Sequence, residues 1–244
     1  MILKYRNNVI EYNIIKRKRK SICIKVDIEG NVSVLAPQRI SDESLVNLVK
    51  EKAEWILEKK VEMSKINDKK IIRKFQNGST FMYLGKEYPV HIIYDNSYKN
   101  IRVLFGGKTL KSPYDCQHFI IYTNTNDDEQ MKKAMENWYR ERTMEIVKKK
   151  IKVYEKCFKD KVSEVRVKEQ KKRWASCTGK NAILFNWRCS MAREDIIEYI
   201  VVHEMCHFEH RNHSKAFWDR VKSIMPDYKK RHEYLRENGI NMCL

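Results

Sequence analysis

Two histidines and a glutamate in the last fifth of the chain have the spacing of a zinc site. His203, Glu204 and His207 form the pattern H-E-x-x-H inside a segment with helical periodicity. A spacing of four residues puts both histidines on one helix face, so both imidazoles can bind one Zn²⁺ ion. Glu204 lies about 100° round the helix. It therefore lies beside the metal, where a general base for a zinc-activated water is expected.

Two later histidines compete as the third zinc ligand. His210 follows His203 by seven residues, and on a straight helix their backbones would lie about 10 Å apart. His213 follows Asn212, a residue type that adopts the left-handed conformation with which helices end. The chain could then turn back and present His213 from another direction. We favour His213 over His210, with water in the fourth position, which is typical of catalytic zinc.

This site predicts a zinc-dependent metallopeptidase that acts on peptides or proteins. Zinc lowers the pKa of its water toward neutrality and polarises the peptide carbonyl. Glu204 takes the proton of that water and passes it to the leaving amine. The oxyanion formed on the substrate needs a further donor. Tyr228, Arg231 and Arg173 are candidates, and the sequence does not choose among them.

The elements that must position these residues indicate an α+β fold. Alternating apolar residues predict strands within 9–36, 71–123 and 162–189. Helical spacing predicts a helix after Ser41, a long helix over 127–158, and three closing helices over 193–209, 215–224 and 227–238. Gly239 is the expected left-handed stop of the last helix. We expect three segments: a strand-rich region with a helix over 1–65, a strand-rich segment over 66–125, and the metallopeptidase domain over 126–244.

Composition restricts the setting in which this chemistry operates. No apolar run of the 244 residues approaches the roughly 20 that a membrane-spanning helix needs. The first residues lack the apolar stretch of a secretory signal. The seven cysteines are odd in number and include no C-x-x-C pair, which argues against a disulfide framework or a cysteine-rich zinc site. We expect a cytoplasmic protein with reduced cysteines and no membrane partner.

Several blocks of the chain resemble the YgjP-like metallopeptidases, relatives of the SprT-like proteases and other zincins. The matching blocks are 170–177, 186–187, 201–207, 212–218 and 226–228, with weaker similarity over 16–37 and 52–57. The resemblance implies one zinc ion bound by His203, His207 and His213, and Glu204 as base. It also implies a zincin-like domain with a long helix, a small sheet, an H-E-x-x-H helix and C-terminal helices. Ala175 departs from the family, which usually has glycine there.

The resemblance also bears on the substrate cleft. Zincins bind peptides by strand addition to an edge strand, so the segment with Arg173, Trp174 and Ser176 is a candidate cleft wall. Ordinary sheet packing of these residues is the alternative hypothesis.

A formal net charge of +18 keeps a second function open. The chain could be a basic nucleic-acid-associated module with a structural zinc site. Because SprT-like relatives act on DNA-bound proteins, it could also be a protease of nucleic-acid-bound proteins. We favour a lysine-rich composition without nucleic-acid binding as the explanation of the charge.

Overall fold

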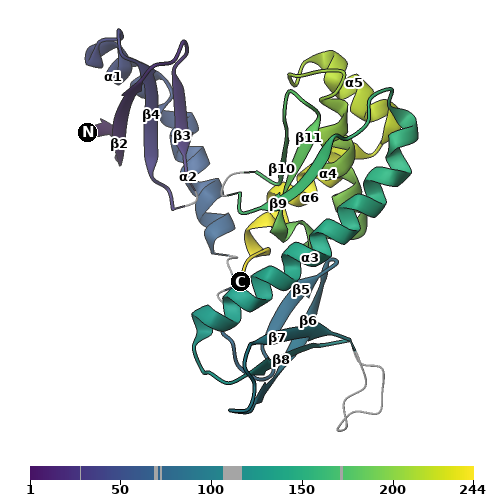
Figure 1. Cartoon of the computed structure of the whole chain (residues 1–244). Helices are drawn as coiled ribbons and strands as arrows, with labels where there is room; N and C mark the ends of the chain where they lie inside the picture. The colour runs from purple at the N-terminus through teal and green to yellow at the C-terminus, as the bar shows by residue number, and fades with distance from the viewer. Residues whose placement is uncertain (28, 69–70, 72, 107–116, 171–172) are drawn as a thin grey trace. The chain divides into compact units, whose positions relative to one another are not determined.

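We analysed a computed structural model of the chain, which describes residues 1–27, 29–68, 71, 73–106, 117–170 and 173–244 (Figure 1). Cys116 and residues 171–172 of one family-like block lie outside the described residues. The described part contains six α-helices and three small sheets, which confirms the mixed α+β class. It divides into two compact units, 1–71 and 72–244. None of the described helices has the length and apolar character needed to cross a membrane.

The first unit is a four-stranded sheet followed by two helices. Its strands are β1 (Ile2–Tyr5), β2 (Asn8–Arg17), β3 (Cys23–Val26) and β4 (Val32–Pro37), in the order β1-β2-β4-β3. The helices are α1 (Asp42–Glu51) and α2 (Ala53–Asn67). Ser41 caps α1 as expected, because its side chain accepts a hydrogen bond from the backbone N–H of Ser44. The apolar faces of sheet and helices form a core of their own.

The second unit begins with a sheet that repeats this topology. Its strands are β5 (Thr80–Tyr83), β6 (Lys86–Tyr94), β7 (Arg102–Phe105) and β8 (Phe119–Thr123). Their order is β5-β6-β8-β7, and in both sheets the successive pairs are antiparallel, parallel and antiparallel. The sequence shows no internal repeat at these positions, so the likeness is one of topology.

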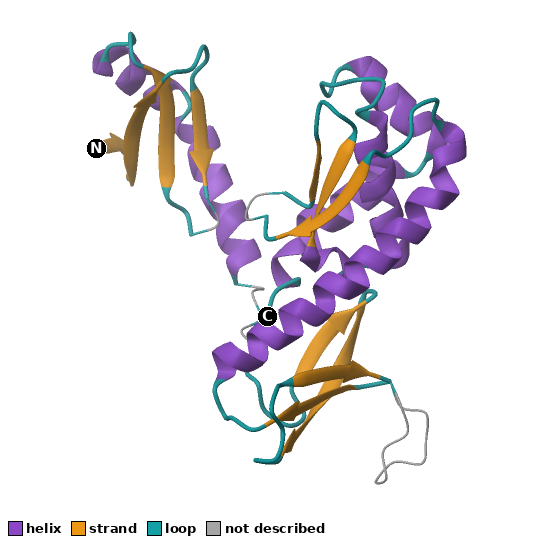
Figure 2. Ribbon diagram, viewed as in Figure 1, coloured by secondary structure: helices purple, strands orange, loops and turns teal. Residues whose placement is uncertain are grey.

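The long helix α3 (Asp128–Tyr154) joins this sheet to the rest of the second unit. It runs between the β5–β8 sheet and a three-stranded sheet (Figure 2). Asp127 caps it by accepting from the backbone N–H groups of Glu129 and Gln130. Trp138 packs edge-on against Phe119 of β8, with ring centroids 5.1 Å apart. Segments 66–125 and 126–244, which we expected as separate parts, therefore contribute to one core.

The three-stranded sheet carries one wall of the candidate site. It consists of β9 (Glu164–Lys168), β10 (Ala175–Cys177) and β11 (Ala182–Asn186) in the order β10-β11-β9, which places β10 at an edge. The predicted strand was expected to continue to residue 189, but a 3₁₀ helix over Trp187–Met191 begins after Asn186. The Asn186 side chain accepts from the backbone N–H of Arg188 and so starts that turn.

Three helices close the chain, as predicted. They are α4 (Glu194–Cys206), α5 (Lys215–Ile224) and α6 (Tyr228–Asn238). Helix α4 ends three residues before the expected end at residue 209. The expectation of a left-handed Asn212 was wrong, because Asn212 is absent from the described residues with positive φ. Gly239 is also not left-handed, with φ of −59°.

Candidate metal centre

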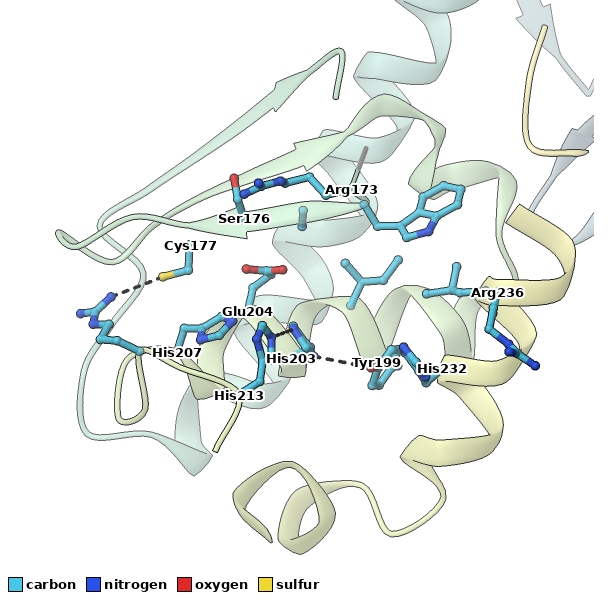
Figure 3. Close-up of a pocket in the computed structure, with 15 residues that line it drawn as sticks. Arg173, Ser176, Cys177, Tyr199, His203, Glu204, His207, His213, His232 and Arg236 are labelled. Carbon is cyan, nitrogen blue, oxygen red and sulfur yellow. Dashed lines mark hydrogen bonds between the residues drawn. The ribbon is translucent and has the colours of Figure 1, made fainter. Parts of the chain in front are cut away.

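Three histidines converge at the end of α4. His203 lies in the last turn of the helix, His207 is its C-cap residue, and His213 lies just before α5. Each offers one ring nitrogen, and these three atoms lie within 4.8 Å of one another. The Nε2 atoms of His203 and His213 are 3.0 Å apart (Figure 3). His210, the alternative third ligand, does not belong to this group.

Contacts with neighbouring groups hold these imidazoles in place. The Nδ1 atom of His207 lies 2.9 Å from the backbone carbonyl oxygen of His210. A carbonyl only accepts hydrogen bonds, so Nδ1 carries the proton and Nε2 keeps its lone pair for a metal. The His207 ring stacks on Phe217 and the His213 ring stacks on Trp218. The His203 ring also lies against Phe217 and Trp218, with ring centroids 4.9 and 5.7 Å apart, so the first turn of α5 contacts all three rings.

The surroundings keep the rings of α4 neutral. Burial, together with the neighbouring imidazoles of His207, His213 and His232, lowers the pKa of His203 to about 3. Burial also lowers the pKa of His207, although its hydrogen bond to the His210 carbonyl raises it. Neutral imidazoles have the free lone pairs that metal coordination requires.

Glu204 lies beside the histidines, and one of its carboxylate oxygens makes no hydrogen bond to the described residues. Its side chain is only 6% exposed. Its Oε2 atom is buried and has no hydrogen-bond partner among the described residues. Burial raises the pKa of Glu204 to about 7, although the charge of Arg173 and the backbone N–H of Cys177 lower it. A buried carboxylate oxygen without a partner is costly, so this atom is poised for a ligand or a water.

A cavity of about 610 Å³ opens over these residues. Strand β10 and the loop before it form one wall, α4 forms the floor, and α6 closes one end (Figure 3). Besides the three histidines and Glu204, it is lined by Arg173, Trp174, Ala175, Ser176, Cys177, Tyr199, Ile200, Arg211, His232, Leu235 and Arg236.

The pairing of β10 shows which of its backbone groups face away from the sheet. Trp174 accepts from the N–H of Asn186 and Thr178 donates to Ala182, so the even-numbered residues pair with β11. The N–H and C=O groups of Ala175 therefore point to the free edge. The N–H of Cys177 points the same way, where it interacts with the Glu204 carboxylate. The free edge of β10 therefore faces the candidate metal centre.

The loop before β10 is held by polar contacts to the sheet. The Asn186 side-chain amide donates to the backbone carbonyl oxygens of Gln170 and Arg173. Glu169 accepts from the indole N–H of Trp187 and from the guanidinium of Arg188. These bonds position the segment that carries Arg173 and Trp174.

The structure separates the predicted cleft residues into two groups. Arg173, Trp174 and Ser176 line the cavity, whereas Tyr228 and Arg231 are not among its lining residues. The Tyr228 ring stacks on Trp218, with 18° between the ring planes. The Arg231 guanidinium pairs with Asp227 and Glu198 and donates to the backbone carbonyl of Asp195.

Sequence reasoning missed the contribution of α6 to the cavity. His232, Leu235 and Arg236 all line it. They fall at helical spacing on one face of α6, which is the signal that could have marked them as a group. Nothing in the sequence indicates that this face turns toward the histidines.

Comparison with known protein families gives a match. A family model described as the YgjP-like metallopeptidase domain matches residues 20–238. No curated protein matches the chain significantly. The model spans most of both units, including every residue of the candidate metal centre.

Proposed function

Because the chain belongs to the YgjP-like metallopeptidase family, we propose that it hydrolyses peptide bonds with one zinc ion and Glu204 as general base. The zinc ligands in this proposal are His203, His207 and His213. The observation that carries it is the convergence of three imidazole nitrogens within 4.8 Å of one another, beside a buried carboxylate. The family match identifies a metallopeptidase domain. That the metal is zinc, and that these residues bind it, is our inference.

The donor set fits zinc. Imidazole nitrogens are common zinc ligands, and three protein ligands leave the fourth tetrahedral position to water or substrate. The bond from Nδ1 of His207 to the His210 carbonyl is the kind of outer contact that orients a zinc-binding histidine. When bound, zinc supplies a Lewis acid that polarises the scissile carbonyl and lowers the pKa of water.

Glu204 is placed to move the protons of the reaction. Its partnerless Oε2 atom accepts a proton from the attacking water and then delivers it to the nitrogen of the leaving amine. Of the three oxyanion donors considered from sequence, only Arg173 lines the cavity. Its charge acts on Glu204, so we assign to Arg173 the stabilisation of the negative charge that develops on the substrate oxygen.

The free edge of β10 supplies a binding site for an extended peptide. The outward N–H and C=O groups of Ala175 pair with the main chain of a substrate that adds to the sheet as a further strand. Such pairing involves only main-chain groups, so it binds an extended peptide without selecting its sequence. It supports a peptide or protein as the substrate class.

Comparing the wild type with Glu204→Gln tests the proposal. Both are loaded with zinc, assayed for bound metal, and incubated with a mixture of peptides whose cleavage is followed by mass spectrometry. We expect both to bind one zinc ion, and Glu204→Gln to be about 10²–10⁴-fold slower. Equal cleavage by both proteins, or one-to-one zinc binding without cleavage of any peptide, would contradict the proposal.

Nucleic-acid binding and a cytoplasmic location stay predictions. The first rests on the net charge of +18 and not on a feature of the candidate metal centre. The tightest basic run, residues 16–20, includes the end of β2 and the loop before β3 in the first unit.

A further inference from the structure

One part of the cavity beside Glu204 is apolar. Ile200 precedes Glu204 by one helical turn and shares its face of α4. Leu235 of α6 and Trp174 of the loop before β10 complete this apolar wall. Three separate elements thus bring hydrophobic side chains to one place. Ile200 is 3% exposed and Leu235 is 7% exposed, so each presents only a small part of its surface to the cavity.

The indole of Trp174 packs against Gly239, a glycine whose backbone conformation does not require glycine. Gly239 has φ of −59° and ψ of −25°, a conformation that alanine adopts freely. A Cβ atom there would lie 2.7 Å from Cζ2 of Trp174 and 3.5 Å from Cε2. Carbon atoms in contact lie about 3.5–4.0 Å apart, so the ring would have to move. Gly239 therefore gives the indole room to form the wall.

The charged residues that line the cavity are mostly cationic. Arg173, Arg211 and Arg236 line the cavity, and Glu204 is its only carboxylate among the described residues. A lysine or arginine side chain of a substrate would therefore meet three like charges, and the one carboxylate there is the proposed general base. An apolar side chain would bury its surface against the wall without this penalty.

We propose that Trp174, Ile200 and Leu235 form a specificity subsite for a large apolar side chain next to the scissile bond. This inference rests on the proposed function, since it assumes that the reacting bond lies over Glu204 and the three histidines. The subsite selects peptides with residues such as leucine or phenylalanine over glycine or lysine. Strand addition to β10 holds the substrate main chain, and this subsite sets the register.

Binding of peptide hydroxamates to the zinc-loaded full chain tests the subsite without requiring turnover. Hydroxamates chelate zinc, and two series place a glycine, alanine, leucine, phenylalanine or lysine side chain on either side of the chelating group. We expect the leucine and phenylalanine compounds of one series to bind about 10–100-fold more tightly than its glycine compound, as measured by calorimetry. The lysine compound should bind no more tightly than the glycine compound.

Gly239→Ala tests the wall without altering any cavity-lining residue. We expect this variant to reduce the preference for leucine over glycine to under about threefold, with glycine-compound affinity unchanged. Gly179→Ala is the matched control, because a Cβ there meets nothing within 4 Å. Trp174→Ala provides a second route if Gly239→Ala does not fold, and it should also lose the preference.

Equal affinities of all side chains in both series would overturn the subsite while leaving the proposed zinc site intact. A preference that survives in both Gly239→Ala and Trp174→Ala would overturn the assignment to this wall. Failure of every hydroxamate to bind would instead contradict the metal site, and the subsite with it.

Discussion

The Nε2 atoms of His203 and His213 lie 3.0 Å apart, although ten residues separate them in the chain. Helix α4 ends after Cys206, and the following turn brings His213 back over the helix end. The early end of the helix therefore decides which histidine joins the pair on α4. His210 lies within that turn and contributes its backbone carbonyl to His207.

This arrangement predicts different effects for two histidine substitutions. His213→Ala removes a ring nitrogen of the convergent group, and we expect zinc affinity to fall at least about 100-fold. His210→Ala keeps the backbone carbonyl that orients His207, so its zinc affinity should stay within about threefold of the wild type. Competition with a chromophoric zinc indicator measures both. Equal losses in the two variants would show that our ligand assignment is wrong.

Removal of the metal should lower thermal stability. A ligand that binds only the folded state at 100 times its Kd stabilises that state by about 2.7 kcal/mol. For a unit of this size, that corresponds to a shift in Tm of about 5–10 °C. We expect this shift in calorimetry when zinc is removed from the wild type or from Glu204→Gln. His213→Ala should show little shift, and a full shift there would contradict the site.

Arg173 should affect turnover more than substrate binding. Loss of one donor to a developing oxyanion typically costs 10²–10³-fold in kcat, and we expect Arg173→Gln to fall in this range with KM within about threefold. Arg166→Gln, on β9, removes an exposed cation of the same type and serves as control. A rise in KM with unchanged kcat would instead indicate that Arg173 binds the ground state of the substrate.

The sequence predicted the parts of this protein that depend on local chemistry. The spacing of His203 and His207 was enough to expect both on one turn of a helix. The helix after Ser41 was expected because a serine hydroxyl accepts from a backbone N–H group two or three residues later, and Ser41 does so. Even the favoured third histidine, His213, belongs to the convergent group.

The parts that depend on tertiary packing were not predictable. Gly239 was expected to end a helix in the left-handed conformation. Instead, its lack of a side chain leaves room for the indole of Trp174. Tyr228 and Arg231 were candidate oxyanion donors, and the sequence did not choose between them and Arg173. Their side chains instead pack on Trp218 and pair with Asp227 and Glu198. Which face of α6 turns inward is decided by packing, and no periodicity encodes it.

A buried hydroxyl should contribute to the stability of the second unit. Thr143 of α3 is 0% exposed, and its hydroxyl donates to the Trp187 carbonyl at 2.7 Å, lies 2.8 Å from the Ser190 hydroxyl and accepts from the Ser190 backbone N–H. Thr143→Val keeps the shape but leaves these partners unsatisfied, so we expect a loss of about 1–3 kcal/mol in urea unfolding. Thr80→Val, at an exposed position of β5, should change stability by less than about 0.5 kcal/mol. An unchanged free energy of unfolding in Thr143→Val would contradict this role.

The contacts of Glu169 predict a pH dependence of folding. Burial alone would raise the pKa of Glu169, but hydrogen bonds from Trp187 and Arg188 outweigh it, so the net pKa lies below the ordinary 4.5. A carboxylate with a lower pKa in the folded state stabilises that state above pH 4.5, and the contribution is lost as pH falls through the folded pKa.

Glu169→Gln should therefore reduce stability near pH 6 but much less near pH 3. Because this side chain is 39% exposed, the expected loss near pH 6 is about 0.5–1 kcal/mol. Urea unfolding of the wild type and the variant at the two pH values measures it. Glu164→Gln is the control, since its partner Arg166 lies on the same strand at an exposed position. A loss of equal size at both pH values would mean that the shape of Glu169, and not its charge, holds the loop before β10.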